Sequence, residues 1–134
     1  MSIVVDTNVL VSGLLNPHGA PGRIVDLIVT GDVSLLVDDH ILAEYHEVLQ
    51  RGRFGFEAAD VDALLALIDA SAIRVHGAPL AERLPDRDDE PFLEVAIAGE
   101  ADTLVTGNVR HFPARLAQGM RIVSPAAFVA SRRS

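Results

Sequence analysis

The sequence predicts an α/β protein built on a parallel sheet with helices on both faces. Short apolar runs alternate along the chain with longer segments in which apolar residues recur every three or four positions, as in strands alternating with amphipathic helices. The apolar runs are nearly continuous, which is typical of strands buried on both faces. The 134 residues contain no internal repeat and no linker composition, so we expect one domain that spans residues 1–134.

The predicted strands are short apolar segments, at residues 3–5, 33–37, 73–75, 103–105 and 122–123. The first of them, Ile3-Val4-Val5, is β-branched throughout, and we expect it at the centre of the sheet. Gly107 closes the segment that contains the fourth strand.

The predicted helices lie between and after these strands, at residues 24–29, 39–49, 58–70, 92–98 and 125–130. In the helix that begins at Asp39, the apolar residues at positions 41, 42, 45, 48 and 49 share one face. Segments 51–56 and 77–88 contain glycine or proline and are expected to be loops. We expect the last four residues, 131–134, to fray.

Composition narrows the function classes. The chain has no cysteine, which excludes disulfides and thiolate metal sites. Its net charge of −8 argues against a protein that holds nucleic acid through a broad basic surface. No apolar stretch approaches the roughly 20 residues of a membrane-spanning helix, and the start of the chain lacks the pattern of a signal peptide. We therefore expect a cytoplasmic protein without a membrane partner.

Polar side chains follow most of the predicted strands. Asp6-Thr7-Asn8 follows the first strand, and Asp38-Asp39 follows the second, with Glu44 one helical turn later. The segment 86–90 precedes the helix near Phe92, and Thr106-Gly107-Asn108 follows the fourth strand. Because functional groups collect beyond the carboxyl ends of parallel strands, we expect these four segments to meet.

Each of these polar residues also has a purely structural interpretation. Asp6 and the acidic run 86–90 are suited to capping helices, and Asn108 is a common turn residue after glycine. Glu44 lies at the border of its helix's apolar face, roughly 100° from the centre, whereas Glu47 falls on the outer side. Glu44 is therefore positioned to reach a cleft, and Glu47 is expected to face solvent.

Carboxylate and amide oxygens, without cysteine or histidine, suit Mg²⁺ or Mn²⁺. Mg²⁺ keeps several waters, so three carboxylates and an amide are a sufficient ligand set. Such a site is typical of phosphodiester hydrolysis, in which the metal polarises the phosphoryl oxygen and generates a hydroxide nucleophile.

Four motifs resemble those of PIN domains. They are Val4-Val5-Asp6-Thr7-Asn8-Val9-Leu10, Ile41-Leu42-Ala43-Glu44-Tyr45, the run from Asp86 to Glu94, and Leu104-Val105-Thr106-Gly107-Asn108 with Arg110-His111-Phe112. Their order and spacing match the family over nearly the whole chain. Within the family, the chain is most similar to the PIN proteins of bacterial toxin–antitoxin systems, the VapC-like toxins.

The resemblance implies a three-layer α/β/α sandwich with a parallel sheet of about five strands. It implies an endoribonuclease that uses Mg²⁺ or Mn²⁺, that often forms homodimers, and that a small antitoxin protein blocks. The resemblance implies that Asp6, Glu44 and Asp89 are the catalytic, metal-binding carboxylates. Asp88 or Glu90 are alternatives to Asp89, because the third motif aligns only to within one residue.

Asn108 takes the place at which many members of the family have aspartate. An amide carries no charge, which leaves a second metal ion in doubt.

Further residues are candidates for substrate binding. Thr7 and Thr106 are candidates for positioning water or a phosphate oxygen. Arg51 and Arg53, beside Phe54 and Phe56, offer phosphate contacts and a stacking surface, with a solvated loop or aromatic rings of the core as the alternative interpretation. The run Arg110-His111 is a second candidate for phosphate contact.

Rival enzyme classes lack their required residues. All eleven basic residues are arginine, whereas haloacid-dehalogenase-like phosphatases, phosphorylation receivers and Walker-type loops each need a lysine. The Gly-x-Ser-x-Gly elbow of serine hydrolases is missing as well. Two alternatives stay open: a PIN module that has lost activity and acts as a binding protein, and an RNA-processing or DNA-directed nuclease outside any toxin system.

Overall fold

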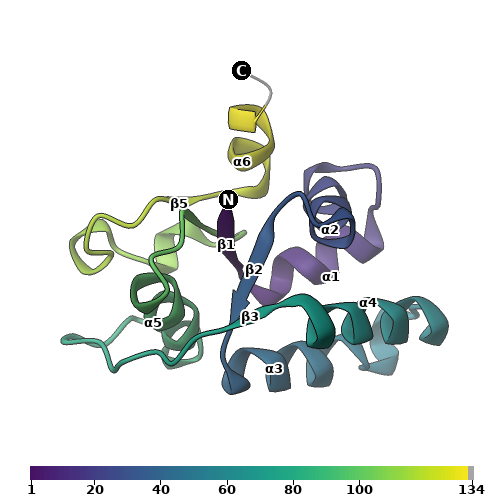
Figure 1. The fold of residues 1–134 in the computed structure, drawn as a ribbon, viewed down its shortest axis with the longest axis horizontal. Coiled ribbons are helices and arrows are strands. Elements are labelled where there is room, and N and C mark those ends of the chain that lie inside the picture. The colour runs from purple at the N-terminus through teal and green to yellow at the C-terminus, as the bar shows by residue number, and fades with distance from the viewer. Residues whose placement is uncertain (133–134) are drawn as a thin grey trace.

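The computed structural model describes residues 1–132, which form a parallel sheet with helices on both sides (Figure 1). Its strands are β1 (Ser2–Val5), β2 (Ser34–Val37), β3 (Ile73–Arg74), β4 (Thr103–Val105) and β5 (Ile122–Val123). The strand order is β3-β2-β1-β4-β5, and every neighbouring pair is parallel. The predicted fold class and the central place of the first strand are therefore confirmed.

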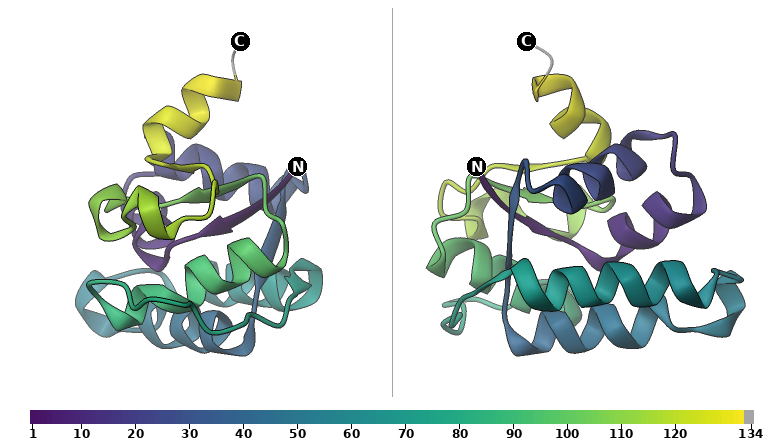
Figure 2. Two further views of the ribbon diagram at one scale, coloured as in Figure 1. Left: turned by 90° about the vertical axis from the view of Figure 1, so that its left-hand side faces the viewer. Right: turned by 45° about the vertical axis from the view of Figure 1, so that its right-hand side comes forward.

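Helices cover both faces of this sheet in three layers (Figures 1 and 2). One layer contains α1 (Thr7–Leu15), α2 (Ala20–Thr30) and α6 (Pro125–Arg132). The opposite layer contains α3 (Asp39–Leu49), α4 (Ala58–Ser71) and α5 (Glu90–Ala98). None of these helices, within residues 1–132, combines the length and apolar character needed to cross a bilayer.

The core lies on both sides of β1, whose residues Ile3, Val4 and Val5 are fully buried. Helix α2 contributes Ile24 and Ile28 from one side. The largest fully buried rings are those of Tyr45, Phe92 and Phe128, which come from α3, α5 and α6. Burial of these side chains, at roughly 25 cal/mol per Å² of apolar surface, holds both helical layers against the sheet.

The main difference from the predicted elements concerns the first helical layer. Helix α1 was not predicted, because Thr7–Leu15 is apolar on most positions and shows no distinct stripe. Helix α2 begins at Ala20, four residues before the predicted start, since Pro21 is tolerated in the first turn of a helix. Gly22 is needed there, because a Cβ atom would lie 2.1 Å from the carbonyl oxygen of Pro17.

Smaller differences occur in the loops and at the carboxyl terminus. Short 3₁₀ turns form at Gly52–Phe54 and Arg87–Asp89, inside or at the end of predicted loops. Two residues of the tail that was expected to fray, 131 and 132, belong to α6, and residues 133–134 lie outside the described part of the chain.

Candidate active site

The carboxyl ends of β1 and β4 lie side by side where the strand order reverses. Asp6, directly after β1, donates its backbone N–H to the carbonyl oxygen of Val105 at the end of β4, at 2.9 Å. From the opposite layer, the hydroxyl of Tyr45 on α3 donates to the carbonyl oxygen of Val5, at 2.5 Å. In open parallel sheets, such a reversal point forms the crevice in which ligands bind.

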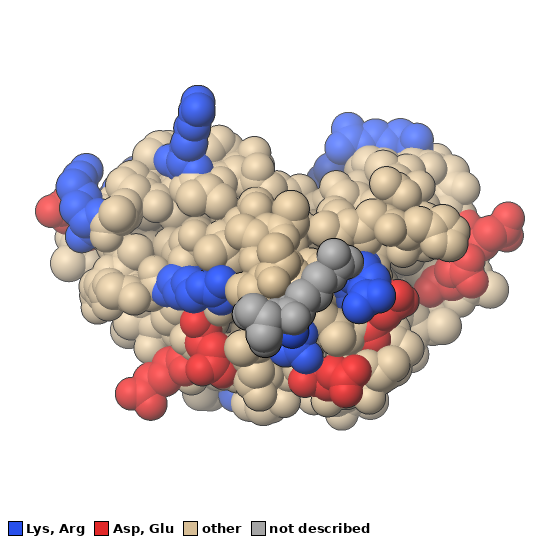
Figure 3. Space-filling view, turned by 90° about the horizontal axis from the view of Figure 1, so that it is seen from above, with Lys and Arg blue, Asp and Glu red and all other residues tan. Residues whose placement is uncertain are grey.

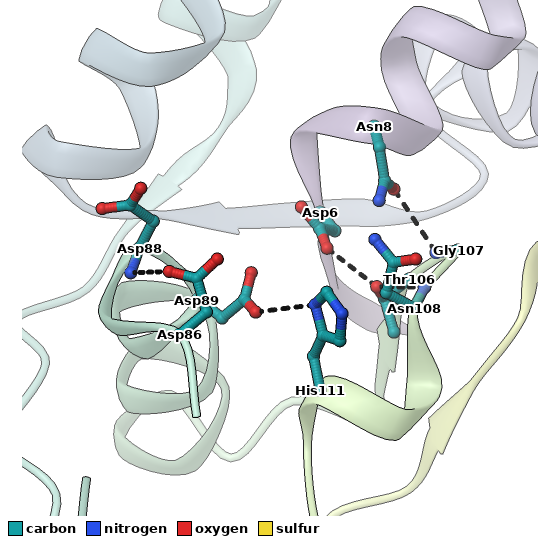
Figure 4. Close-up of polar contacts among 9 residues, drawn as sticks. All are labelled: Asp6, Asn8, Asp86, Asp88, Asp89, Thr106, Gly107, Asn108 and His111. Carbon is teal, nitrogen blue, oxygen red and sulfur yellow. Dashed lines mark hydrogen bonds and ion pairs between the residues drawn. The ribbon is translucent and has the colours of Figure 1, made fainter. Parts of the chain in front are cut away.

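Asp6 is held at the floor of this crevice (Figure 4). Its side chain is only 6% exposed, and its Oδ2 accepts a hydrogen bond from the hydroxyl of Thr106, at 2.7 Å. Burial raises the pKa of the Asp6 carboxyl, and hydrogen bonds from Thr106 and from the backbone of Asn8 and Thr7 partly oppose this rise. Asp6 is therefore a buried carboxylate that hydrogen bonds stabilise, and no arginine of residues 1–132 forms an ion pair with it.

Glu44 reaches the same crevice from α3. Its side chain is partly buried, whereas Glu47 on the same helix is exposed and pairs with Arg51 at 2.7 Å. The predicted orientation of these two glutamates is confirmed. The hydroxyl of Thr7 donates to the Glu44 carboxylate. Burial raises the pKa of Glu44, and the negative charges of Asp6 and Asp88 raise it further.

The acidic run before α5 separates into side chains with different surroundings. Asp89 is buried, and its Oδ2 lies 3.1 Å from Nδ1 of His111. Asp86 caps the 3₁₀ turn Arg87–Asp89 by accepting from the backbone N–H of Asp88, at 2.9 Å. Asp88 is exposed.

Glu90 turns away from the crevice. Its carboxylate accepts from the backbone N–H of Leu84 at 3.0 Å and from Arg83 at 3.2 Å. Among the three candidates left open by the sequence, Asp89 is thus the enclosed one that faces the crevice, and Asp88 is near enough to Glu44 to raise its pKa. Burial raises the pKa of Asp89 to about 6, together with the charges of Asp6 and Asp86 and against the influence of His111.

The segment after β4 closes the crevice on the side of α1. Asn108 donates its backbone N–H to the hydroxyl oxygen of Thr106 at 3.0 Å, and its amide group lies beside Asp6 and Thr106 in Figure 4. Gly107 donates its N–H to Oδ1 of Asn8, at 3.3 Å. The bond from Gly107 to Asn8 ties the fourth motif to the first, and Asn108 is an exposed residue at the edge of the crevice.

The arginines proposed as substrate contacts lie in two different places. Arg110 is next to His111 at the crevice, is exposed and forms no ion pair with a described residue. Arg51 pairs with Glu47, and Arg53 lies over the ring of Phe54 at 4.9 Å. Arg51 follows Glu44 by seven positions and lies just beyond the end of α3 at Leu49. On the face seen in Figure 3, the arginines of the described chain stand in separate groups.

The donors at the crevice fit a hard divalent cation. All of them are oxygen atoms, from Asp6, Glu44, Asp89 and the amide of Asn108. As the side chains of residues 1–132 are arranged, no group of three or more acidic or histidine side chains is close enough to hold a metal ion. Mg²⁺ retains several waters and takes few protein ligands, so this spacing agrees with its chemistry. A cation would also relieve the mutual repulsion that raises the pKa of Glu44 and Asp89.

Sequence reasoning missed the contacts that two residues make with these groups. His111 was considered as a phosphate contact, and Tyr45 only as a core residue. Their signal is positional: Tyr45, the single tyrosine of the chain, directly follows Glu44, and His111 lies within the fourth motif. Tyr45 holds the backbone directly before Asp6, and His111 contacts the carboxylate of Asp89.

Three comparisons with known proteins agree with this geometry. A profile of the PIN domain matches residues 2–110. An uncharacterized protein of Methanocaldococcus jannaschii is 32% identical over 112 residues, which cover 81% of this chain and 71% of that protein. The crystal structure of VapBC2 from Rickettsia felis, bound to a DNA fragment from its promoter, contains a similar fold. That likeness has a TM-score of 0.59 and 16% identity, and it covers 92% of this chain and 98% of the other. The chain therefore belongs to the PIN domain family, whose members are generally metal-dependent nucleases.

Proposed function

We propose that this protein is an endoribonuclease that hydrolyses RNA phosphodiester bonds with the help of Mg²⁺ or Mn²⁺. One observation carries the proposal. Asp6, Glu44 and Asp89 come from separate parts of the chain to one crevice, and no arginine of the described residues pairs with them. Carboxylates that are drawn together and left without a cation are the arrangement that a metal nuclease requires.

The residues of the crevice have distinct roles in this proposal. Asp6 and Asp89 would hold the cation directly or through water, and Glu44 would hold a water or a third coordination position. The hydroxyls of Thr7 and Thr106 donate hydrogen bonds to the carboxylates of Glu44 and Asp6. They would therefore orient these carboxylates before the substrate binds. When bound, the cation supplies activation of the attacking water and screening of the charged phosphate.

Arg110 would contact the RNA backbone at the mouth of the crevice. The acidic crevice repels phosphate while no metal is bound, and the exposed guanidinium of Arg110 offsets part of this repulsion. Arg51 and Arg53 would act farther along the RNA.

We also infer that the protein is the toxin of a toxin–antitoxin pair, as a homodimer that a small antitoxin protein inhibits. The VapC-like motifs and the fold shared with the VapBC2 structure support this assignment, although at 16% identity that likeness concerns the fold alone. Expression of the chain should arrest growth, and co-expression of the protein from a small neighbouring gene should restore it. Normal growth on expression of the active enzyme would favour an RNA-processing nuclease instead.

Asn108 favours a second candidate, a PIN module that binds RNA without cleaving it. The amide stands where many family members have a carboxylate, and it supplies no charge for a second metal ion. The two candidates differ in their response to Asn108→Asp. A binding module would gain cleavage from this substitution, whereas an active nuclease would already cleave without it.

Cleavage of a labelled RNA tests the main proposal directly. We expect the full chain to cleave RNA with Mg²⁺ or Mn²⁺ and to stop in EDTA. Asp6→Asn should reduce the rate on the order of a thousandfold, because it removes the most buried carboxylate of the crevice. The matched control, Glu47→Gln, changes a solvent-exposed carboxylate and should leave the rate unchanged. Undiminished cleavage by Asp6→Asn, with a native melting curve, would refute the assignment.

A further inference from the structure

Helices α3 and α4 form a hairpin (Figure 2). Its tip contains a pocket that the catalytic crevice does not include. Its volume is about 230 Å³, and Leu49 and Val61 form an apolar floor. Phe56 provides an aromatic wall, and Gln50, Arg51 and Asp62 provide polar groups. An apolar cavity with a few polar groups is the usual form of a ligand site, and this volume suits one planar ring system rather than a large ligand.

Helix α3 connects the pocket to the crevice. Glu44 reaches the crevice from this helix, and Leu49, which lines the pocket, lies five positions later at the end of the helix. The distance along the helix is roughly 7.5 Å, or about two nucleotide steps of a stacked strand at 3.4 Å each. An RNA strand with its scissile phosphate near Glu44 would therefore place a neighbouring base beside the pocket.

The loop beside the pocket offers stacking and phosphate contacts. The rings of Phe54 and Phe56 stack at 5.3 Å between centroids with an angle of 19°, and Arg53 lies over Phe54. Gly55 lies between these two rings with φ 68°, a backbone conformation that favours glycine. Aromatic rings with an adjacent arginine are the platform on which proteins stack the bases of single strands.

We propose that this pocket binds one base of the RNA substrate, and that it prefers bases with an exocyclic amino group over uracil. The inference rests on the proposed function. Asp62 only accepts hydrogen bonds when ionised, so it matches the exocyclic amino group of cytosine, adenine or guanine. Uracil offers such an acceptor only its N3–H, which lies between two carbonyl oxygens that repel a carboxylate. The same carboxylate repels phosphate, which places the RNA backbone outside the pocket near Arg53.

Gly52 offers a way to block the pocket without disturbing the fold. It lines the cavity, and a Cβ atom added there meets no atom within 4 Å. Gly52→Leu should therefore fill part of the pocket while α3 and α4 stay in place. Ala127→Leu is the control, because it places the same leucine side chain at an exposed position of α6.

The test is a titration of the ¹⁵N-labelled full chain in EDTA with CMP, AMP, GMP and UMP, followed by amide NMR shifts. We expect saturable shifts within residues 49–62 for the three amino-bearing nucleotides and weaker shifts for UMP. Gly52→Leu should weaken this binding roughly tenfold, as expected from loss of one stacked base, and Ala127→Leu should leave it unchanged. Asp62→Asn should remove the discrimination against UMP, because an amide both donates and accepts.

Three results would overturn the inference: no shifts in this segment, equal binding of UMP, or broadening of the same signals with protein concentration alone. The last result would assign the pocket to contact between copies of the chain. Because binding is measured without metal and without cleavage, it is independent of the nuclease assay. Nucleotide binding in a chain that does not cleave RNA would refute the proposed nuclease function but would still support base binding in the pocket.

Discussion

Carboxylates at the crevice and glutamates elsewhere in the molecule differ in the side chains that they contact. Away from the crevice, three glutamates pair with arginines at 2.5 to 3.2 Å, in Glu47–Arg51, Glu82–Arg115 and Glu90–Arg83. At the crevice, Asp6 and Glu44 contact only threonine hydroxyls among the described side chains, and Asp89 contacts His111. The crevice thus gathers carboxylates that no arginine of the described residues pairs with, in contrast to these three glutamates.

This difference distinguishes carboxylates that form structural ion pairs from carboxylates that are suited to bind a ligand. Exposed pairs contribute little to stability, typically up to about 1 kcal/mol each. The crevice carboxylates instead lower the stability of the metal-free protein, since burial raises the pKa of Asp6, Glu44 and Asp89, and repulsion from other carboxylates raises the pKa of Glu44 and Asp89 further. Clustered groups with raised pKa are typical of functional sites, and a bound cation would reverse the penalty.

Substitution of the two glutamates on α3 tests the comparison on a single helix. Glu44→Gln should weaken Mn²⁺ binding on the order of a hundredfold, because Glu44 faces the crevice. Glu47→Gln should leave the affinity unchanged, because Glu47 pairs with Arg51 in solvent. Isothermal titration calorimetry measures both Mn²⁺ affinities. Equal losses of affinity in the two variants would show that the orientation of the glutamate on α3 does not determine metal binding.

Asp89 should make the metal-free protein less stable as pH rises. Its pKa in the folded state is raised from 3.8 to about 6, so the folded state holds a proton in this window that the unfolded state has lost. The unfolding free energy therefore falls between about pH 4 and pH 6 and stays lower above pH 6. Asp89→Asn should gain on the order of 2 kcal/mol at pH 7.5, and the gain should disappear near pH 4.

Urea unfolding in EDTA at several pH values measures the effect of Asp89→Asn. The adjacent Asp88→Asn is the control, since Asp88 is exposed and its replacement should change stability by less than about 0.5 kcal/mol. Burial raises the pKa of Asp6 and Glu44 as well, so some dependence on pH should persist in the variant. A loss of stability in Asp89→Asn at pH 7.5 would contradict the account of repulsion.

Tyr45→Phe should have a smaller effect on stability and on metal binding. The substitution removes the bond from the Tyr45 hydroxyl to the carbonyl oxygen of Val5, which joins α3 to the end of β1. Loss of a buried hydrogen bond costs about 1 to 2 kcal/mol. Mn²⁺ affinity should fall less than in Glu44→Gln. Thr30→Val, which removes an exposed hydroxyl, is the control for urea unfolding.

Arg110→Ala should have the smallest effect of the four. Arg110 lies beside the crevice without an ion-pair partner among the described residues, whereas Arg115 pairs with Glu82. We expect RNA cleavage to fall about threefold at low salt, with a salt dependence reduced by about one phosphate contact. Arg115→Ala should change neither quantity, and identical behaviour of both variants would remove Arg110 from the substrate path.

The sequence was sufficient for the sheet and for the side of α3 that carries Glu44. Short apolar runs in the sequence predicted the strands. Glu44 and Glu47 could be distinguished because they lie at different angles around the helix. Helix α1 escaped prediction because Thr7–Leu15 has no polar stripe to give it a period. Tertiary packing against α2, rather than the sequence of α1 alone, explains that helix.

The choice among Asp88, Asp89 and Glu90 depended on local backbone geometry. The 3₁₀ turn Arg87–Asp89, capped by Asp86, directs Asp89 inward, and one residue of difference in this turn would direct another carboxylate there. The ion pair between Arg51 and Glu47 could have been predicted from the sequence, because the two residues have the i, i+4 spacing of a helical ion pair.

Anomalous diffraction from a crystal soaked in Mn²⁺ tests the central claim most directly. We expect one strong peak in the crevice, within coordination distance of a carboxylate oxygen of Asp6 or Asp89 and with waters completing the shell. Glu47, Glu82 and Glu90 should carry no peak, because arginines already neutralise them. An empty crevice at saturating Mn²⁺, or a peak at the arginine-paired glutamates, would contradict the account.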